Sequence, residues 1–115
     1  MKVKRGDIIM VRLYGHGNIQ EGFRPAIIVQ NNAGNRFSPT TIVVPLTSKI
    51  KQTSQPTHEL IRTEDTEGLR EDSMALCEQI VTISKSSIVK KIGEITNGST
   101  MNNISKACLI SLDLA

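Results

Sequence analysis

Two short runs of apolar residues constrain the fold of this chain more than any other feature. The runs cover residues 26–29 and most of residues 40–47, and neither shows the apolar–polar alternation of a strand with one exposed face. Ile and Val number 22 in the whole chain against 8 Leu, and β-branched side chains favour the pleated surface of a sheet. The sequence therefore predicts a mainly β protein with strands buried on both faces.

The length of 115 residues predicts a single domain over residues 1–115, because a chain of this size can bury one core and is too short for two. Low Gly and Pro content and the absence of heptad repeats exclude collagen and coiled coils. No apolar run approaches the roughly 20 residues that span a bilayer. The apolar run after Lys2, Lys4 and Arg5 stops at Arg12, so we expect no targeting segment and a cytoplasmic protein.

The other elements follow from alternation, turn residues and helical spacing. Polar, glycine-rich residues 14–22 predict a loop, residues 31–35 a turn and residues 48–57 a long exposed loop. Ser84 is placed to cap a short helical turn. We expect a strongly curved sheet or barrel of about five to seven strands with short helices. Strands are expected at residues 3–13, 23–30, 40–47, 58–62 and 73–83, and a C-terminal helix packed across the sheet at residues 100–112.

Charge is unevenly distributed along the chain. The net charge is +3, residues 23–51 hold four basic residues and no acid, and residues 59–72 hold six acids. Residues 84–106 are basic again. A basic region free of acids suits a polyanion, although an ordinary solvated surface explains the same pattern. Aromatic residues make up 3% of the chain, too few for a generic stacking platform for single-stranded nucleic acid.

The cysteines and histidines lack the spacing of a metal site. Cys77 and Cys108 lie 31 positions apart in apolar segments, and neither is paired with a second Cys or a His at ligand spacing. His16 and His58 are equally isolated. We therefore expect two reduced, buried thiols and no metal.

Arg24 and Thr47 stand at the ends of the two apolar runs. Arg24 precedes Pro25, which restrains the arginine backbone toward extended geometry and holds the guanidinium at the rim of the sheet. If the two strands pair antiparallel, the start of one lies beside the end of the other, and a five-donor cation meets a hydroxyl. Such a pair can bind a phosphate; the alternative is a surface arginine and a threonine that ends a strand. The sequence contains no zinc, phosphate-loop, dinucleotide or nucleophile-elbow motif.

Several segments match a known protein family, in order and over nearly the whole chain. The most specific is Gly-Phe-Arg-Pro at residues 22–25 with the apolar run that follows it. On these segments the sequence resembles the MazF/PemK family of toxin endoribonucleases. The matching segments lie at residues 3–8, 22–31, 35–40, 44–48, 56–58, 71–73 and 76–80.

The resemblance implies a compact SH3-like β-barrel with helices that works as a homodimer. It implies cleavage of single-stranded RNA at selected sequences without a metal or other cofactor. The ribose 2′-hydroxyl attacks the adjacent phosphorus and leaves 2′,3′-cyclic phosphate and 5′-hydroxyl ends. Relatives in this subgroup often prefer a U-A-C-containing pentamer. The implied partner is a cognate antitoxin that covers the RNA-binding surface.

The resemblance also implies roles for particular residues. Arg24 and Thr47 match the pair credited with catalysis, in which the arginine supplies charge and hydrogen-bond donors to the phosphorane and the threonine holds a phosphate oxygen. Residues 48–57 match a loop that closes over the substrate. RNA contacts are implied for Gln20, Asn31, Ser48, Glu78 and Gln79.

Some positions depart from the family pattern. Ile19 stands where relatives often have a glutamate, and Glu21 lies two positions further on. The plasmid-borne branch is credited with an arginine and an aspartate where this chain has Leu76 and Glu78. Two roles therefore stay open for Glu78, a contact to a base edge and a general base. His16 is open as a catalytic acid or as a solvated loop residue.

Two other functions fit a small barrel of this kind. One is a non-catalytic toxin of the type that poisons DNA gyrase, but that branch relies on a C-terminal tail with a tryptophan, and this chain has no Trp. The other is a module that binds RNA or protein without cutting, which predicts affinity without strand scission.

Overall fold

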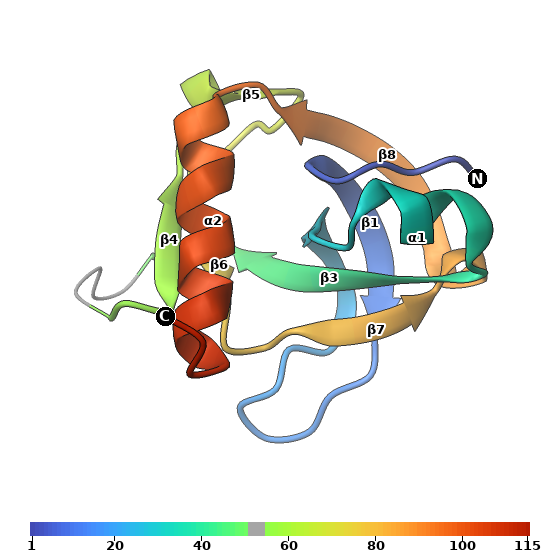
Figure 1. The fold of residues 1–115 in the computed structure, drawn as a ribbon, viewed down its shortest axis with the longest axis horizontal. Helices are drawn as coiled ribbons and strands as arrows, with labels where there is room; N and C mark the ends of the chain where they lie inside the picture. The colour runs from blue at the N-terminus through green and yellow to red at the C-terminus, as the bar shows by residue number, and fades with distance from the viewer. Residues whose placement is uncertain (51–54) are drawn as a thin grey trace.

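The computed structural model describes residues 1–50 and 55–115. Over these residues the chain forms a nearly closed antiparallel barrel with a C-terminal helix laid against it (Figure 1), which confirms the predicted fold class. The strands are β1 (Asp7–Leu13), β2 (Gly22–Ile28), β3 (Thr40–Thr47), β4 (His58–Ile61), β5 (Thr66–Glu67), β6 (Ser73–Leu76), β7 (Val81–Ser84) and β8 (Ile88–Ile95). The helices are α1 (Asn32–Phe37) and α2 (Gly98–Ser111), with short 3-10 turns η1 (Thr63–Asp65) and η2 (Lys85–Ser87).

The barrel is organised around β3, which pairs with three strands. The order along the sheet is β4-β6-β3-β2-β1-β8-β5, and β7 also pairs with β3. The first half of β3 pairs with β7, from Thr40 opposite Ser84 to Val43 opposite Val81, and its last two residues pair with β6. By changing partner along its length, β3 joins the two parts of the barrel.

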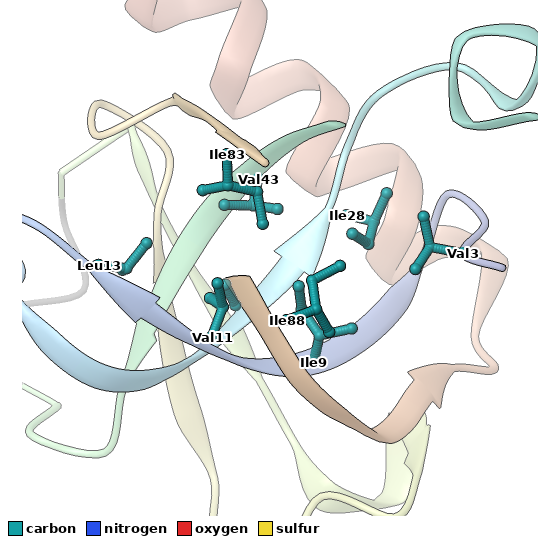
Figure 2. Close-up of a cluster of buried hydrophobic side chains, with 9 residues drawn as sticks. Val3, Ile9, Val11, Leu13, Ile28, Val43, Ile83 and Ile88 are labelled. Atoms are coloured by element: carbon teal, nitrogen blue, oxygen red, sulfur yellow. The ribbon is translucent and has the colours of Figure 1, made fainter. Parts of the chain in front are cut away.

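Adjacent residues of the apolar runs enter two different cores. Ile27 and Val44 belong to the cluster that also contains α2 residues, whereas Ile28 and Val43 belong to the cluster between the strands (Figure 2). All four residues have no exposed surface. Because successive side chains of a strand point to opposite faces, a strand packed on both faces requires a run with no polar position. The prediction of strands buried on both faces is confirmed.

The prediction of a single strand over residues 73–83 is wrong, because the structure has two strands there, β6 and β7. The chain turns between β6 and β7, where the Gln79 backbone N–H donates to the Leu76 carbonyl oxygen at 2.9 Å. β6 and β7 pair with different halves of β3, so one straight strand cannot serve both. The turn between them carries Glu78 and Gln79.

Other elements differ from the expected bounds. β1 begins later than expected, at Asp7, because Gly6 (φ +94°) turns the chain just before it. Residues 31–35 open α1 instead of forming a simple turn, since the Asn31 side chain accepts a hydrogen bond from Gly34 N and caps the helix. β8 is not predicted by the sequence at all, and the short β5 lies inside the acidic connection.

The C-terminal helix α2 lies against β4 (Figure 1) and also contacts β8. It begins at Gly98, two residues earlier than expected, and Ser84 caps η2 as expected. Ile104 and Ala107 are buried in the core beneath it, whereas Leu112, expected on the same stripe, is 57% exposed. None of the helices in the described part of the chain is long and apolar enough to cross a membrane.

Candidate active site

Arg24 and Thr47 lie at one rim of the barrel, on neighbouring antiparallel strands. β2 pairs with β3 with Ala26 opposite Pro45, and the same register carried two residues further puts Thr47 opposite Arg24. The expected antiparallel pairing of these strands is therefore confirmed. Directly opposite residues of an antiparallel pair point to the same face, so the guanidinium and the hydroxyl leave the sheet on one side.

Three clefts surround this rim. The basic cleft, of about 710 Å³, is lined by Arg24, Thr47, Ser48, Lys49, Arg70 and Lys90, among others. The loop cleft, of about 470 Å³, is lined by Arg24 and Thr47 again, with Gln20, His58, Glu78 and Gln79. The apolar cleft, of about 660 Å³, shares Gln20, Glu78 and Gln79 with the loop cleft. Arg24 and Thr47 thus stand where the basic cleft meets the loop cleft.

Hydrogen bonds hold the Arg24 and Thr47 side chains in place and, within the described part of the chain, leave other donor groups of both residues free. Arg24 Nε donates to the Glu21 carbonyl oxygen at 2.9 Å, and its terminal nitrogens have no hydrogen-bond partner within residues 1–50 and 55–115. Gly22, in the left-handed region (φ +85°), starts the strand that carries the arginine. Thr47 Oγ1 accepts from Lys49 N at 3.1 Å, which leaves the hydroxyl proton available as a donor.

The basic cleft has a surplus of positive charge. Among the described residues, its cations Lys49, Arg70 and Lys90 take part in no ion pair, whereas Lys91 is paired with Asp7 at 3.1 Å. The segment Gly68–Glu71 forms part of the wall, so the acidic stretch of the sequence borders the basic cleft and contributes Arg70 to it. Unpaired cations in a concave surface attract a polyanion.

Gln79 ties the β6–β7 turn to the glycine-rich loop before β2. Its Oε1 accepts from Gln20 N at 2.9 Å, and its Nε2 donates to the Asn18 carbonyl oxygen at 3.2 Å. These contacts span more than half the chain in sequence, and they bring two of the predicted RNA contacts, Gln20 and Gln79, to one wall of the loop cleft.

The Glu78 carboxylate is held by two neighbours that the sequence did not identify. Thr57 Oγ1 donates to Glu78 Oε2 at 2.7 Å, and His58 Nε2 lies 3.0 Å from Glu78 Oε1. His58 Nδ1 is buried and has no partner within the described residues. Because a carboxylate oxygen can only accept, His58 Nε2 is the donor in its contact with Glu78. From the sequence alone His58 is a candidate only for metal binding, because nothing near it in the sequence reveals the contact with Glu78.

The remaining predicted residues are placed differently. Asn31 caps α1 by accepting from Gly34 N at 2.8 Å, and among the described residues it lines none of the three clefts. His16 is exposed on the loop and also lies outside their walls. Ser48 lines the basic cleft. Of the expected closing loop 48–57, residues 51–54 lie outside the described residues.

Comparison with known proteins places the whole chain in one family. A protein-family model described as PemK-like, MazF-like toxin of type II toxin–antitoxin system matches residues 4–112. The chain is 41% identical over 115 residues to endoribonuclease EndoA of Bacillus subtilis (strain 168), an alignment that covers 99% of this chain and 97% of EndoA. It is 36% identical over 113 residues to endoribonuclease MazF of Staphylococcus saprophyticus, with 97% and 92% of the two chains covered.

A solved structure has the same fold. An endoribonuclease in complex with its cognate antitoxin, from a mycobacterial species, superposes with a TM-score of 0.79 at 28% identity, covering 98% of this chain and 97% of that one. The family resemblance found in the sequence is confirmed at the level of both sequence and fold. The chain belongs to the PemK-like, MazF-like family of toxins of type II toxin–antitoxin systems.

Proposed function

We propose that this chain is the endoribonuclease toxin of a toxin–antitoxin pair, and that Arg24 and Thr47 act together on the scissile phosphate of single-stranded RNA. The observation that supports this most is that the two residues line the same two clefts in a chain that matches endoribonucleases over nearly its full length. The reaction is the metal-independent attack of a 2′-hydroxyl on the adjacent phosphorus.

Cleavage is accelerated by protein groups that bind the transition state more tightly than they bind the RNA substrate. As the 2′-oxygen attacks, negative charge builds up on the phosphorane oxygens, and preorganised donors that meet this charge lower the barrier. The Arg24 guanidinium is a planar cation whose fork of N–H donors matches the oxygens of a phosphate. Its terminal N–H groups stabilise the phosphorane, and the Thr47 hydroxyl donates to a non-bridging oxygen.

In this proposal the basic cleft binds the phosphates of the RNA and the loop cleft binds its bases. Lys49, Arg70 and Lys90 attract the phosphates along the basic cleft. Glu78 and Gln20 lie in the loop cleft on the other side of the catalytic pair, where unstacked bases present their edges. A carboxylate accepts hydrogen bonds from an exocyclic amino group, and two protein donors fix the orientation of the Glu78 carboxylate. We therefore assign base recognition to the loop cleft.

The partners follow from the same proposal. The solved mycobacterial relative is in complex with its cognate antitoxin, and we propose that a cognate antitoxin inhibits this chain by covering the basic and loop clefts. We also propose that this chain acts as a homodimer in the cytoplasm. The rival functions, a gyrase poison and a binder that does not cut, predict that RNA stays intact.

The test is incubation of purified protein with a long single-stranded RNA in the presence of EDTA. Defined fragments that end in 2′,3′-cyclic phosphate support the endoribonuclease. Arg24→Ala protein, purified in parallel and shown to be folded by circular dichroism, controls for contaminating ribonuclease, which would cut in both samples. RNA that is bound but remains intact would overturn the proposal in favour of a binding module.

A further inference from the structure

Two cysteines that the proposed reaction does not use lie together under the end of α2. Cys77 follows β6 directly and has no exposed surface. Cys108 lies in the last turn of α2 and is partly exposed. Both are free thiols. Neither lines any of the three clefts described above, within the residues that the structure describes.

The backbones of the two cysteines are joined by one hydroxyl group. Ser111 Oγ lies 2.9 Å from the carbonyl oxygen of Cys77 and 2.8 Å from that of Cys108. Both side chains pack in the same hydrophobic cluster, with Ile104 and Ala107. The Cys77 and Cys108 side chains are close enough to influence each other's ionisation. Residues 31 positions apart in the chain thus bring two thiols together in one core.

The two sulfur atoms differ in character. The neighbouring Cys77 thiol lowers the pKa of Cys108, and the positive charge of Arg5 adds to this effect against the opposing effect of burial. The Cys108 thiol, with burial next, raises the pKa of Cys77. The partly exposed Cys108 is therefore the sulfur that ionises, and a thiolate is the form that reacts with oxidants.

We propose that Cys77 and Cys108 form a peroxide-reactive dithiol that closes to an intramolecular disulfide. The Cys108 sulfur attacks a peroxide oxygen, which breaks the O–O bond, and it becomes a sulfenic acid while the other oxygen leaves as water. The Cys77 sulfur then attacks the sulfenic sulfur, forms the S–S bond and releases a second water. Two electrons pass from the pair to the peroxide, and the two thiol protons end in the released water.

The disulfide has a structural consequence. Cys77 begins the turn that carries Glu78 and Gln79, and Cys108 belongs to the last turn of α2. The bond fastens the end of the helix to this turn, where the Ser111 hydroxyl makes the only noncovalent bridge between the two carbonyls within the described residues. Closing a 31-residue loop restricts the unfolded chain, so the oxidised protein should melt several degrees higher than the reduced one.

The test uses the full-length protein, reduced and then treated with hydrogen peroxide. Peptide mapping without reductant should find Cys77 linked to Cys108 within one chain, and a dithiol reductant should restore both thiols. In Cys77→Ser, Cys108 should accumulate as a sulfenic acid that dimedone traps. In Cys108→Ser, the buried Cys77 should remain a thiol under the same treatment.

Several results would overturn the proposal. These are two thiols that persist in the wild-type protein, a Cys108 that passes to sulfinic acid without a linked peptide, and a disulfide between two copies of the chain. The wild-type peptide map decides between these results even if a variant fails to fold. RNA cleavage plays no part in this readout, so the peptide map tests the dithiol independently of the proposed endoribonuclease activity.

Discussion

Arg24 and Thr47 face the same two clefts from neighbouring antiparallel strands, although 23 positions separate them in the chain. The relationship depends on the register that sets Ala26 opposite Pro45. A slip of one residue would turn one of the two side chains to the other face of the sheet. The buried runs on both strands fix this register, so the cores position the candidate site directly.

Loss of a cation from the basic cleft should weaken RNA binding in a salt-dependent way. Lys49→Ala and Lys90→Ala each remove a positive charge that lines this cleft. For single-stranded RNA, each lost phosphate contact should lower the slope of log affinity against log salt by about 0.7. Affinity measured over a range of salt concentrations tests this. Lys106→Ala, on the exposed side of α2, is the control and should leave the slope unchanged.

Removal of His58 should impair recognition through Glu78. His58→Ala deletes a hydrogen bond to the Glu78 carboxylate, and a bond to a charged group contributes about 1.5–3 kcal/mol. We expect kcat/KM on the preferred RNA to fall about tenfold or more, with a smaller fall on RNAs that lack the preferred sequence. His16→Ala removes the exposed loop histidine and serves as the matched control. An equal fall on all RNAs would show that His58 does not act through base recognition.

Glu59 should make the stability depend on pH. Burial raises the pKa of Glu59, and its hydrogen bond with Asn103 offsets part of the effect. The folded state therefore binds more protons than the unfolded chain between their two pKa values, and the free energy of unfolding falls as pH rises through that window. Glu59→Gln should be more stable than wild type at neutral pH, and the difference should vanish at low pH. Urea unfolding at both pH values measures it, and the exposed Glu64→Gln should show no such gain.

The packing of α2 should contribute a large share of the stability. Ile104 has no exposed surface, and Leu112, the C-cap residue of the same helix, is 57% exposed. Ile104→Ala should lower the free energy of unfolding by about 2–5 kcal/mol, because it leaves a cavity beneath the helix. Leu112→Ala should change it far less. Urea unfolding followed by circular dichroism compares the two, and equal losses would mean that α2 is not packed as described.

The sequence could suggest that Arg24 and Thr47 lie together, on the condition that two consecutive apolar strands pair antiparallel. Consecutive strands are commonly neighbours, and in an antiparallel pair the start of one strand lies beside the end of the other. The same reasoning failed for residues 73–83. Their alternation continues across the turn, and only the pairing of β3 with two different strands shows where the chain must break.

Contacts between distant segments were beyond the sequence. Lys90 reaches the basic cleft from β8, which the sequence did not predict because register shifts against β1 interrupt its alternation. His58 reaches Glu78 through the pairing of β4 with β6, and Arg70 enters the cleft wall from a loop. In each case the side chain reaches the site from a segment far away in the sequence, which local patterns do not reveal.

The most direct measurement of the central claim is a double-mutant cycle on RNA cleavage. Arg24→Ala and Thr47→Val should each lower kcat by roughly a hundredfold or more, because each removes a donor to the phosphorane. The double variant should lose far less than the product of the two single losses, because both groups act on one phosphate. Undiminished cleavage by a folded Arg24→Ala protein would contradict the account.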